Sequence, residues 1–334
     1  MAGIADVAAL AGVSKSTASR ALSGRGHVSA TTRAKVVVAA ETLGYVPSTT
    51  AVSLATGHTN SIGVIMPYVT RWFFAEVLEG VQQRLLEEGL DLTLYDAKPG
   101  TAARARVFDD FLARKRFDGL IAIGLEPEDR ELERLLAIGC PLVSVVGIAG
   151  SVSVIAVDDD YATRRATEHL IGLGHESIAF LGGGGGEHWP QVERRRLEGY
   201  TAAMEDAGLA AHISHIRAAA SLPASYNAAV DALGDVRSRP TGIVAVSDEV
   251  AVGGIIAARR LGIRVPGDLS VVGIDDHEYA EMFSLTTLRQ VPREQGAAAV
   301  DLLLAHLADP EKPPQTIHMK ARLIVRSSTA APPE

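Results

Sequence analysis

Over most of the chain, the pattern of apolar and polar positions alternates between two types. Short runs that are apolar throughout, such as residues 62–66 and 142–146, are separated by longer stretches with apolar side chains every three or four positions. The first type is typical of parallel strands buried on both faces, and the second of helices buried on one side. The pattern therefore predicts an α/β fold with parallel sheets from about residue 60 onward.

This alternation runs through the chain twice, which predicts two similar α/β lobes. The first series has predicted strands at 62–66, 90–95, 119–123, 142–146 and 152–157, with helices at 76–88, 102–115 and 128–138. The second series has predicted helices at 162–173, 193–207, 227–233 and 250–261, with strands at 178–181, 215–218, 242–246 and 271–274. A long helix at 293–308 and a strand at 323–325 are predicted near the end.

The N-terminal part has a different pattern, which predicts short helices without strands. Val7, Ala8 and Ala11 recur at helical spacing. Gly12 supplies the backbone freedom to end this helix, and Ser14 is suited to cap the next one. A short helix, a tight turn and a second short helix predict a helix-turn-helix.

The second helix of this motif has an apolar side and a polar side. Ala18 and Leu22 are expected to face the rest of the motif. The polar side carries Lys15, Ser16, Ser19 and Arg20. Such a surface is suited to the major groove of DNA. A helical hairpin with a solvated polar face fits the same pattern, so the two helices alone leave DNA binding open.

A third helix and the distribution of charge favour DNA binding. Ser29 is expected to cap this helix, which carries Val36, Ala40 and Leu43 on one side and stops at Gly44. Residues 1–60 contain five Lys and Arg against two Asp and Glu, a net charge of +3, whereas the remainder has −11. A basic head on an acidic body suits phosphate contacts at one end of the molecule.

A series of short motifs runs from the N-terminus to residue 328. The N-terminal motifs are Ile4-x-Asp-Val-Ala-x-x-Ala-Gly-Val-Ser-x-x-Thr-x-Ser-Arg20, His27-Val-Ser29, Thr32-Arg33, Leu43-Gly-Tyr45-x-Pro47 and Ala51-x-x-Leu54. The later ones are Asp158-Asp-Asp-Tyr161, Glu168-His-Leu-x-x-Leu-Gly-His175, Arg196-x-x-Gly-Tyr200, Ser247-Asp248, Pro266-x-Asp-Leu-Ser-Val-Val-Gly-Ile-Asp-Asp276, Leu285-Thr-Thr-Leu288 and Arg322-Leu-Ile-Val-Arg-Ser-Ser328. Together these motifs resemble those of the lactose-repressor (LacI) family of transcription regulators.

The resemblance implies three parts. These are a DNA-binding headpiece at 1–47, a hinge or linker helix at 48–59, and an effector-binding and dimerisation domain at 60–334. The last part would have two lobes, similar to bacterial sugar-binding proteins, with a small molecule between them. Lobe 1 would comprise about 60–157 and 290–320, and lobe 2 about 158–289 and 321–334.

The resemblance also implies roles for residues of the headpiece and hinge. Lys15, Ser16 and Arg20 would read bases, with Ser19 and His27 in the same surface, while Ser14, Ser29 and Tyr45 would contact phosphates or position the headpiece. In the hinge, Ala51 and Leu54 lie on one side of a short helix that needs a partner to be stable, and Leu54 would wedge into the minor groove. A plain flexible linker also fits this Ser/Thr-rich stretch. Ser48 and Val52 depart from the common family pattern.

Polar and aromatic candidates for the effector site follow the predicted strands, where ligands of open α/β sheets bind. By resemblance, Arg196 and Asp275 would hold the effector, Ser247 matches a position that is often Asn, and Phe73 matches a pocket aromatic. Trp72 and Trp189 are added from their loop positions, although each fits a core position equally well. An Arg, an Asp and an aromatic face suit a polyhydroxylated ligand such as a sugar or glycoside.

Other functional classes find little support in the sequence. The glycines at 182–186 lack the spacing of a dinucleotide fingerprint, and neither G-x-S-x-G nor H-E-x-x-H occurs. We therefore expect no enzyme activity, cofactor or metal. The uncharged stretch 135–157 is long enough to span a bilayer, but its glycines and Pro141 favour a helix end and two strands. A single cysteine, Cys140, and no evident signal segment predict a cytoplasmic protein.

These observations predict a transcription regulator, most simply a repressor, controlled by a small molecule. We expect a homodimer on a near-palindromic site in double-stranded DNA, because one headpiece contacts few base edges. A solute-binding protein would not need residues 1–57, and an α/β enzyme would need a catalytic or dinucleotide motif. The identity of the effector, its sign of action and the choice between dimer and tetramer stay open.

Overall fold

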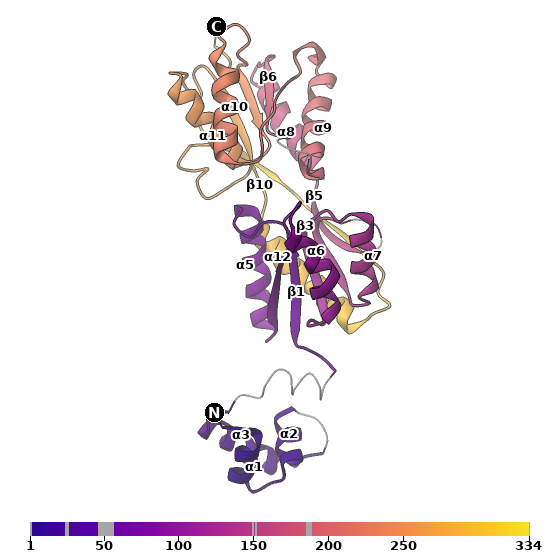
Figure 1. Cartoon of the computed structure of the whole chain (residues 1–334). Helices are drawn as coiled ribbons and strands as arrows, with labels where there is room; N and C mark the ends of the chain where they lie inside the picture. Colours follow the sequence, from indigo (N-terminus) through magenta and orange to yellow (C-terminus); the bar gives the residue numbers. More distant parts are fainter. Residues whose placement is uncertain are drawn as a thin grey trace.

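The computed structural model describes residues 2–23, 27–45, 57–148, 150, 152–184 and 189–333. These residues form a three-helix headpiece and a body of two α/β lobes (Figure 1). The predicted hinge residues Ala51 and Leu54 lie outside the described residues, as do Ser48 and Val52.

The headpiece consists of helices α1 (Ile4–Ala11), α2 (Lys15–Ser23) and α3 (Ala30–Thr42). Gly12 ends α1 in the left-handed conformation, with φ of 67°. The hydroxyl of Ser14 accepts a hydrogen bond from the Thr17 N–H at 3.1 Å, and that of Ser29 accepts one from the Thr32 N–H at 3.2 Å. The predicted turn and both caps are therefore confirmed.

A small core of valine and alanine side chains joins the three helices. Val7, Ala18 and Val36 are fully buried at its centre. Ala18 and Leu22 of α2 face this core as expected, with Leu22 partly buried, and Ala21 is a further buried side chain of the same helix. Small side chains let the helices approach closely, and the polar side of α2 remains exposed.

Lobe 1 is built on a parallel six-stranded sheet with the order β11-β5-β4-β3-β1-β2. Its strands are β1 (Ser61–Met66), β2 (Asp91–Asp96), β3 (Gly119–Leu125), β4 (Leu142–Gly147), β5 (Ser153–Val157) and β11 (Thr316–Met319). Its helices are α5 (Trp72–Glu87), α6 (Ala102–Arg106), α7 (Asp129–Ala137) and α12 (Pro292–Ala308). Two apolar cores cover the faces of this sheet.

Lobe 2 has a second six-stranded sheet with the order β12-β10-β9-β8-β6-β7. Its strands are β6 (Ile178–Leu181), β7 (Ser214–Ile216), β8 (Gly242–Ala245), β9 (Ser270–Asp275), β10 (Thr286–Arg289) and β12 (Arg322–Ile324), of which only β12 runs antiparallel to its neighbour. Its helices are α8 (Asp159–Gly172), α9 (Gln191–Asp206), α10 (Leu222–Gly234) and α11 (Asp248–Arg260), with a 3-10 turn at Ala210–His212.

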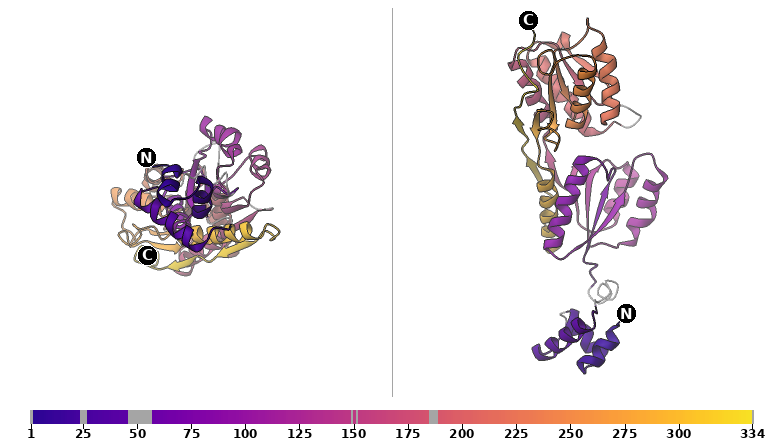
Figure 2. Two further views of the ribbon diagram at one scale, coloured as in Figure 1. Left: turned by 90° about the horizontal axis from the view of Figure 1, so that it is seen from below. Right: turned by 90° about the vertical axis from the view of Figure 1, so that its left-hand side faces the viewer.

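The chain passes between the lobes three times. It leaves lobe 1 between β5 and α8, returns between β10 and α12, and leaves again between β11 and β12. In Figure 2 the helix α12 lies against α5 of lobe 1, although more than 200 residues separate them in the sequence. Gly80 of α5 and Gly296 of α12 make this approach possible, since a Cβ at Gly80 would lie 2.1 Å from the carbonyl oxygen of Arg293.

The structure changes several predicted elements. Strands β10 and β11 were not predicted, because both are short and neither is continuously apolar. The predicted helix at 102–115 is instead α6 followed by a π-helical turn (Val107–Phe111) and a 3-10 turn (Leu112–Arg114). Helix α5 begins at Trp72 and not at Glu76, so Trp72, which was predicted in a loop, is its first residue.

The uncharged stretch at 135–157 forms the end of α7 and the strands β4 and β5, as predicted. Among the described residues, no helix is long and apolar enough to cross a membrane.

Candidate functional site

A cavity of about 160 Å³ lies between the two lobes. Lobe 1 contributes the loop after β1 and the first turn of α5, with Tyr68, Arg71, Trp72, Phe73 and Phe74. Lobe 2 contributes the starts of α8, α9 and α11 and the end of β9, with Asp159, Glu193, Arg196, Ser247, Glu249 and Asp275. The cavity therefore lies at the carboxyl ends of strands from both sheets, where ligands of open α/β sheets bind.

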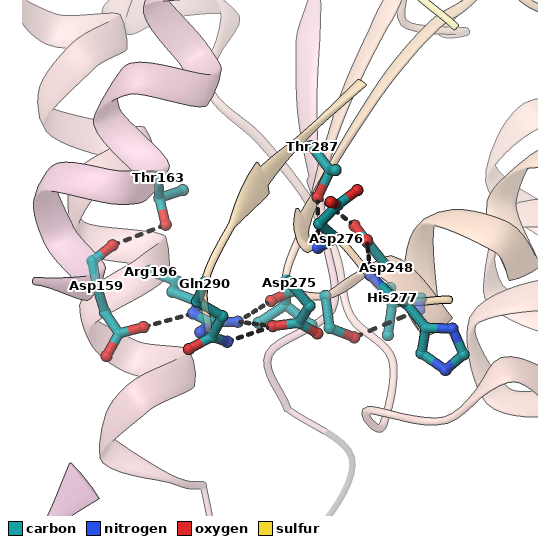
Figure 3. Close-up of polar contacts among 12 residues, drawn as sticks. Asp159, Thr163, Arg196, Asp248, Asp275, Asp276, His277, Thr287 and Gln290 are labelled. Carbon is teal, nitrogen blue, oxygen red and sulfur yellow. Dashed lines mark hydrogen bonds and ion pairs between the residues drawn. The ribbon is translucent and has the colours of Figure 1, made fainter. Parts of the chain in front are cut away.

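Arg196 is the central cation of the lobe 2 wall (Figure 3). Its Nε donates to Asp159 Oδ1 at 2.8 Å, and its Nη1 donates to the carbonyl oxygen of Val246 at 2.5 Å. The Nη1 atom also lies 4.0 Å from Asp275 Oδ1. Arg196 is only 6% exposed, whereas Arg194 and Arg195 beside it are exposed, so Arg196 is the one of these three arginines that faces the interior. A buried guanidinium with donors to spare is suited to bind oxygen atoms of a ligand.

Asp275 is held at the end of β9 by a neighbouring amide. Its Oδ1 accepts a hydrogen bond from Gln290 Nε2 at 2.5 Å, and its backbone has φ of 136°, a conformation that favours glycine. Burial raises the pKa of Asp275 to about 6, although the charge of Arg196 and the hydrogen bond from Gln290 act in the opposite direction. Its other carboxylate oxygen has no hydrogen bond among the described residues.

Asp248 supports this part of the wall from behind (Figure 3). It is fully buried at the start of α11, where it accepts the His277 N–H at 2.8 Å and the Thr287 hydroxyl at 2.7 Å. Burial and the nearby charge of Asp275 raise the pKa of Asp248 to about 8. These bonds fix the chain immediately after Asp275.

The predicted effector residues do not all lie at the cavity. Trp72, Phe73, Arg196, Ser247 and Asp275 line it. Ser247 also caps α11, since its hydroxyl accepts the Val250 N–H at 3.4 Å.

Trp189, by contrast, does not line the cavity. Its ring stacks on His215 with 6.3 Å between the ring centroids, and its Nε1 is buried without a hydrogen bond among the described residues. The alternative of a packing role fits Trp189 better.

The sequence interpretation missed several polar residues of the cavity, among them Asp159, Glu193, Glu249 and Gln290. Asp159 lies in an acidic triplet directly after a strand, and Glu193 precedes Arg196 by one helical turn, so both carried a signal that was not used. Glu249 follows Ser247 by two residues. Gln290 lies between β10, which was not predicted, and α12, so no local pattern indicated it.

Two contacts connect the lobes beside the cavity. The ring of Trp72 from lobe 1 lies against that of His277 from lobe 2, with 4.9 Å between centroids. Elsewhere, Glu126 Oε1, after β3, accepts the N–H of Gln191, at the start of α9, at 2.6 Å. A ligand between the lobes would therefore act on contacts that set their relative position.

The headpiece presents a polar surface on α2. Lys15, Ser16, Ser19 and Arg20 are exposed, and within the described residues neither Lys15 nor Arg20 forms an ion pair. This leaves both cations available for base edges or phosphates.

Of the other predicted DNA-binding residues, Ser14, His27 and Ser29 are exposed, whereas Tyr45 packs partly buried against the headpiece core. The position of Tyr45 is suited to fixing the headpiece.

Comparisons with known proteins cover both parts of the chain. The family described as "Bacterial regulatory proteins, lacI family" matches residues 3–48, and the "Periplasmic binding protein-like domain" matches residues 167–329. The HTH-type transcriptional repressor PurR of Vibrio vulnificus is 32% identical over 98% of each chain. The HTH-type transcriptional regulator DegA of Bacillus subtilis is also 32% identical over 98% of each chain.

Solved structures share the same architecture. The lac repressor dimer bound to operator and the anti-inducer ONPF is 26% identical, with a TM-score of 0.86 over 99% of each chain. The complex of the regulator CelR with cellobiose is 27% identical, with a TM-score of 0.72 over 98% of this chain and 100% of that one.

A helix-turn-helix headpiece joined to a two-lobed body with a cavity between the lobes is the architecture of a class of DNA-binding regulators. The likeness extends over nearly the whole chain, and the chain belongs to the lacI family of bacterial regulatory proteins. It is a DNA-binding transcriptional regulator of that family.

Proposed function

We propose that this protein is a cytoplasmic, homodimeric repressor whose affinity for its operator is controlled by a carbohydrate bound between the lobes. The observation that carries this proposal is the position of Arg196, which is buried at the cavity beside Asp159 and Asp275. Trp72 and Phe73 line the same cavity from the opposite lobe.

This combination of groups suits a sugar or glycoside. The guanidinium donates to hydroxyl oxygens, the carboxylates accept from hydroxyl hydrogens, and an aromatic face covers the C–H side of a sugar ring. Among the relatives, CelR has been solved with cellobiose and a regulator from Enterococcus faecium with ribose. The latter is 26% identical, with a TM-score of 0.72 over 81% of this chain and 99% of that one.

At the other end, Lys15, Ser16 and Arg20 would contact bases, with Ser14, Ser19, His27 and Ser29 beside them. Two headpieces in a dimer would bind half-sites about 34 Å apart on a near-palindromic operator. Ala51 and Leu54 of the predicted hinge would contact the minor groove between them.

Control by the effector follows from the connection between the lobes. A ligand that binds both walls favours one relative position of the lobes, which changes the spacing of the two chains that lead to the headpieces. The contacts of Trp72 with His277 and of Glu126 with Gln191 cross the cleft and would change with that position.

The experiment that tests this function is a fluorescence-anisotropy titration of the purified protein against its own upstream DNA, with a panel of mono- and disaccharides. We expect one sugar to shift the operator affinity. If no sugar shifts it, carbohydrate control is contradicted. If this DNA does not bind in any condition, self-regulation is excluded, and selection from random DNA then tests operator binding.

The variant Arg20→Ala tests whether operator binding and sugar binding depend on different parts of the molecule. Loss of a base or phosphate contact by each of two subunits should weaken operator binding by about 100-fold or more. The Kd of the sugar should not change, because Arg20 lies in the headpiece. An equal loss of both affinities would contradict an independent headpiece.

A further inference from the structure

The cavity contains more carboxylates than guanidinium groups. Its lining includes Glu126, Asp159, Glu193, Glu249 and Asp275 against Arg71, Arg104 and Arg196. Arg104 is already paired with Glu131, at 2.6 Å, and donates to two backbone carbonyls. The lining therefore carries a net negative charge before any ligand is bound.

The excess of carboxylates over guanidinium groups lies on the lobe 2 wall. Arg196 is shared between Asp159 and Asp275, and each of these carboxylates is more than nine-tenths buried with one oxygen that has no hydrogen bond among the described residues. Glu249 lines the same wall and, in the described part of the chain, has neither a hydrogen bond nor an ion pair. Glu193 differs, since the charges of Arg71 and Arg196 act on it.

Glu249 and Asp275 belong to one corner of the cavity. The charge of Glu249 acts on Asp275 and also on His277. The His277 ring lies against Trp72, which lines the cavity from lobe 1. Both carboxylates and the Trp72 ring thus line the same cavity, and His277, two residues after Asp275, contacts that ring.

A neutral sugar would not compensate this charge. Buried charges in proteins are usually paired, because the loss of water around an unpaired charge is costly. An alkylammonium group has three donors and no acceptor, which matches carboxylate oxygens, and it is also attracted to the face of an indole ring.

We propose that the effector is a carbohydrate with a protonated amine, and that Glu249 and Asp275 bind this amine beside Trp72. This inference rests on the proposed function, since it takes the cavity between the lobes as the effector site. In this proposal, Glu249 is the residue that gives the site its preference for amino sugars over neutral sugars.

The proposal has a consequence for the pH dependence of binding. Burial raises the pKa of Asp275 to about 6, so below that pH the carboxyl group is largely neutral. An ammonium group binds the ionised form better, so binding lowers this pKa and releases protons near pH 6. The affinity for an amino sugar should therefore rise between pH 5 and pH 7. The other charged groups that act on Asp275 in this corner are Arg196, Glu249 and Asp159.

Matched sugar sets test the proposal directly. D-glucosamine, D-galactosamine and D-mannosamine are each titrated beside the parent hexose and the N-acetyl derivative, with tryptophan fluorescence and operator release as readouts. We expect one amine to bind at least about tenfold more tightly than both neutral members of its set.

Each other outcome has a definite meaning. Equal or tighter binding of a neutral sugar overturns the amine proposal and leaves carbohydrate control intact. If none of the nine sugars binds, the amine proposal is contradicted. The anisotropy titration of operator DNA with the wider panel of mono- and disaccharides then tests the proposed function separately.

The variant Glu249→Gln tests whether Glu249 causes the preference for amino sugars. It keeps the size of the side chain and removes its charge, so the ratio of the neutral-sugar Kd to the amino-sugar Kd should fall about tenfold, toward one. Glu205→Gln, on the exposed side of α9, is the matched control and should keep the ratio of the wild type. If Glu249→Gln keeps that ratio too, Glu249 does not bind the amine. Circular dichroism checks the fold, and Glu249→Ala provides a second variant.

Discussion

The two lobes share one architecture and differ in the chemistry of their cavity walls. Both sheets have six strands, and in each the helices join mostly parallel neighbours. Lobe 1 faces the cavity mainly with the aromatic first turn of α5, whereas lobe 2 faces it with Asp159, Arg196, Glu249 and Asp275. The sheets supply equivalent strand ends, and the residues that follow those ends decide what each wall binds.

Both lobes also use glycine to bring helices together. Gly80 of α5 lies against α12 in lobe 1, and Gly199 of α9 lies against the carbonyl oxygen of Asp160 at the start of α8 in lobe 2. Because α5 and α9 both carry cavity residues in their first turns, these contacts also position the two walls. The lobes are therefore similar in their scaffold and differ in the chemistry of the site.

The largest expected effect comes from removing the cation of lobe 2. Arg196→Leu would leave Asp159 and Asp275 without their shared cation in a buried site, which should lower the free energy of unfolding by about 3–5 kcal/mol. Thermal and urea denaturation measure this change. The exposed neighbour offers a control, since Arg195→Leu should change stability by less than about 0.5 kcal/mol. Equal effects of both variants would contradict the central place of Arg196.

A second substitution tests the scaffold of lobe 1. A Cβ at Gly80 would lie 2.1 Å from the carbonyl oxygen of Arg293, so Gly80→Ala should destabilise the protein by about 1–3 kcal/mol. Gly172→Ala at the end of α8 is the control, because nothing lies within 4 Å of its Cβ position, and it should be neutral or slightly stabilising. Urea denaturation measures the free energy of unfolding of both variants. If Gly80→Ala is as stable as the wild type, α5 and α12 can move apart at little cost in free energy.

The aromatic wall of lobe 1 should contribute to effector binding without affecting the charged wall. Trp72→Ala removes the indole face, and we expect the effector to bind about tenfold more weakly, which corresponds to about 1–2 kcal/mol. Operator affinity without effector should also shift, because the Trp72 ring contacts His277 across the cleft. Calorimetric titration measures the first quantity and anisotropy the second, while Trp189→Phe, outside the cavity lining, serves as the control.

A further prediction concerns the pH dependence caused by the buried carboxyl group behind the lobe 2 wall. The pKa of Asp248 is raised from 3.8 to about 8 by burial, so between these values the folded protein binds more protons than the unfolded chain. Stability should therefore fall as the pH rises through this window. In Asp248→Asn the melting temperature should vary less between pH 6 and pH 8, while Asp275 still contributes below pH 6. A parallel pH profile in both proteins would show that Asp248 ionises normally.

Much of the fold could be predicted from the sequence, because it depends on local patterns. The predicted strand at 178–181 has the bounds of β6, and Ser14 and Ser29 cap their helices as expected. Strand β11 could not be found this way, since it is an exposed edge strand without an apolar run. Its place in the sheet is decided by pairing with β5, far away in the chain.

The site was less predictable than the fold. Arg196 was chosen through family resemblance, although Gly199, Tyr200 and Ala203, which follow it on the same side of α9, already indicate a buried face. Glu249 and Gln290 had no comparable local signal. Trp189 was chosen from its loop position, which says nothing about the direction of a side chain.

The sequence by itself determined the elements whose causes are local: the turn at Gly12, the helix caps, the apolar strands and the basic character of the headpiece. Only the tertiary structure decided which charged groups meet. Asp159, Arg196 and Asp275 are separated by 37 and 79 residues in the chain, and they lie together because α8 and α9 begin, and β9 ends, at the same edge of lobe 2. The pairing and burial of charges depend on such long-range contacts, so the chemistry of the cavity emerges only when the chain is folded.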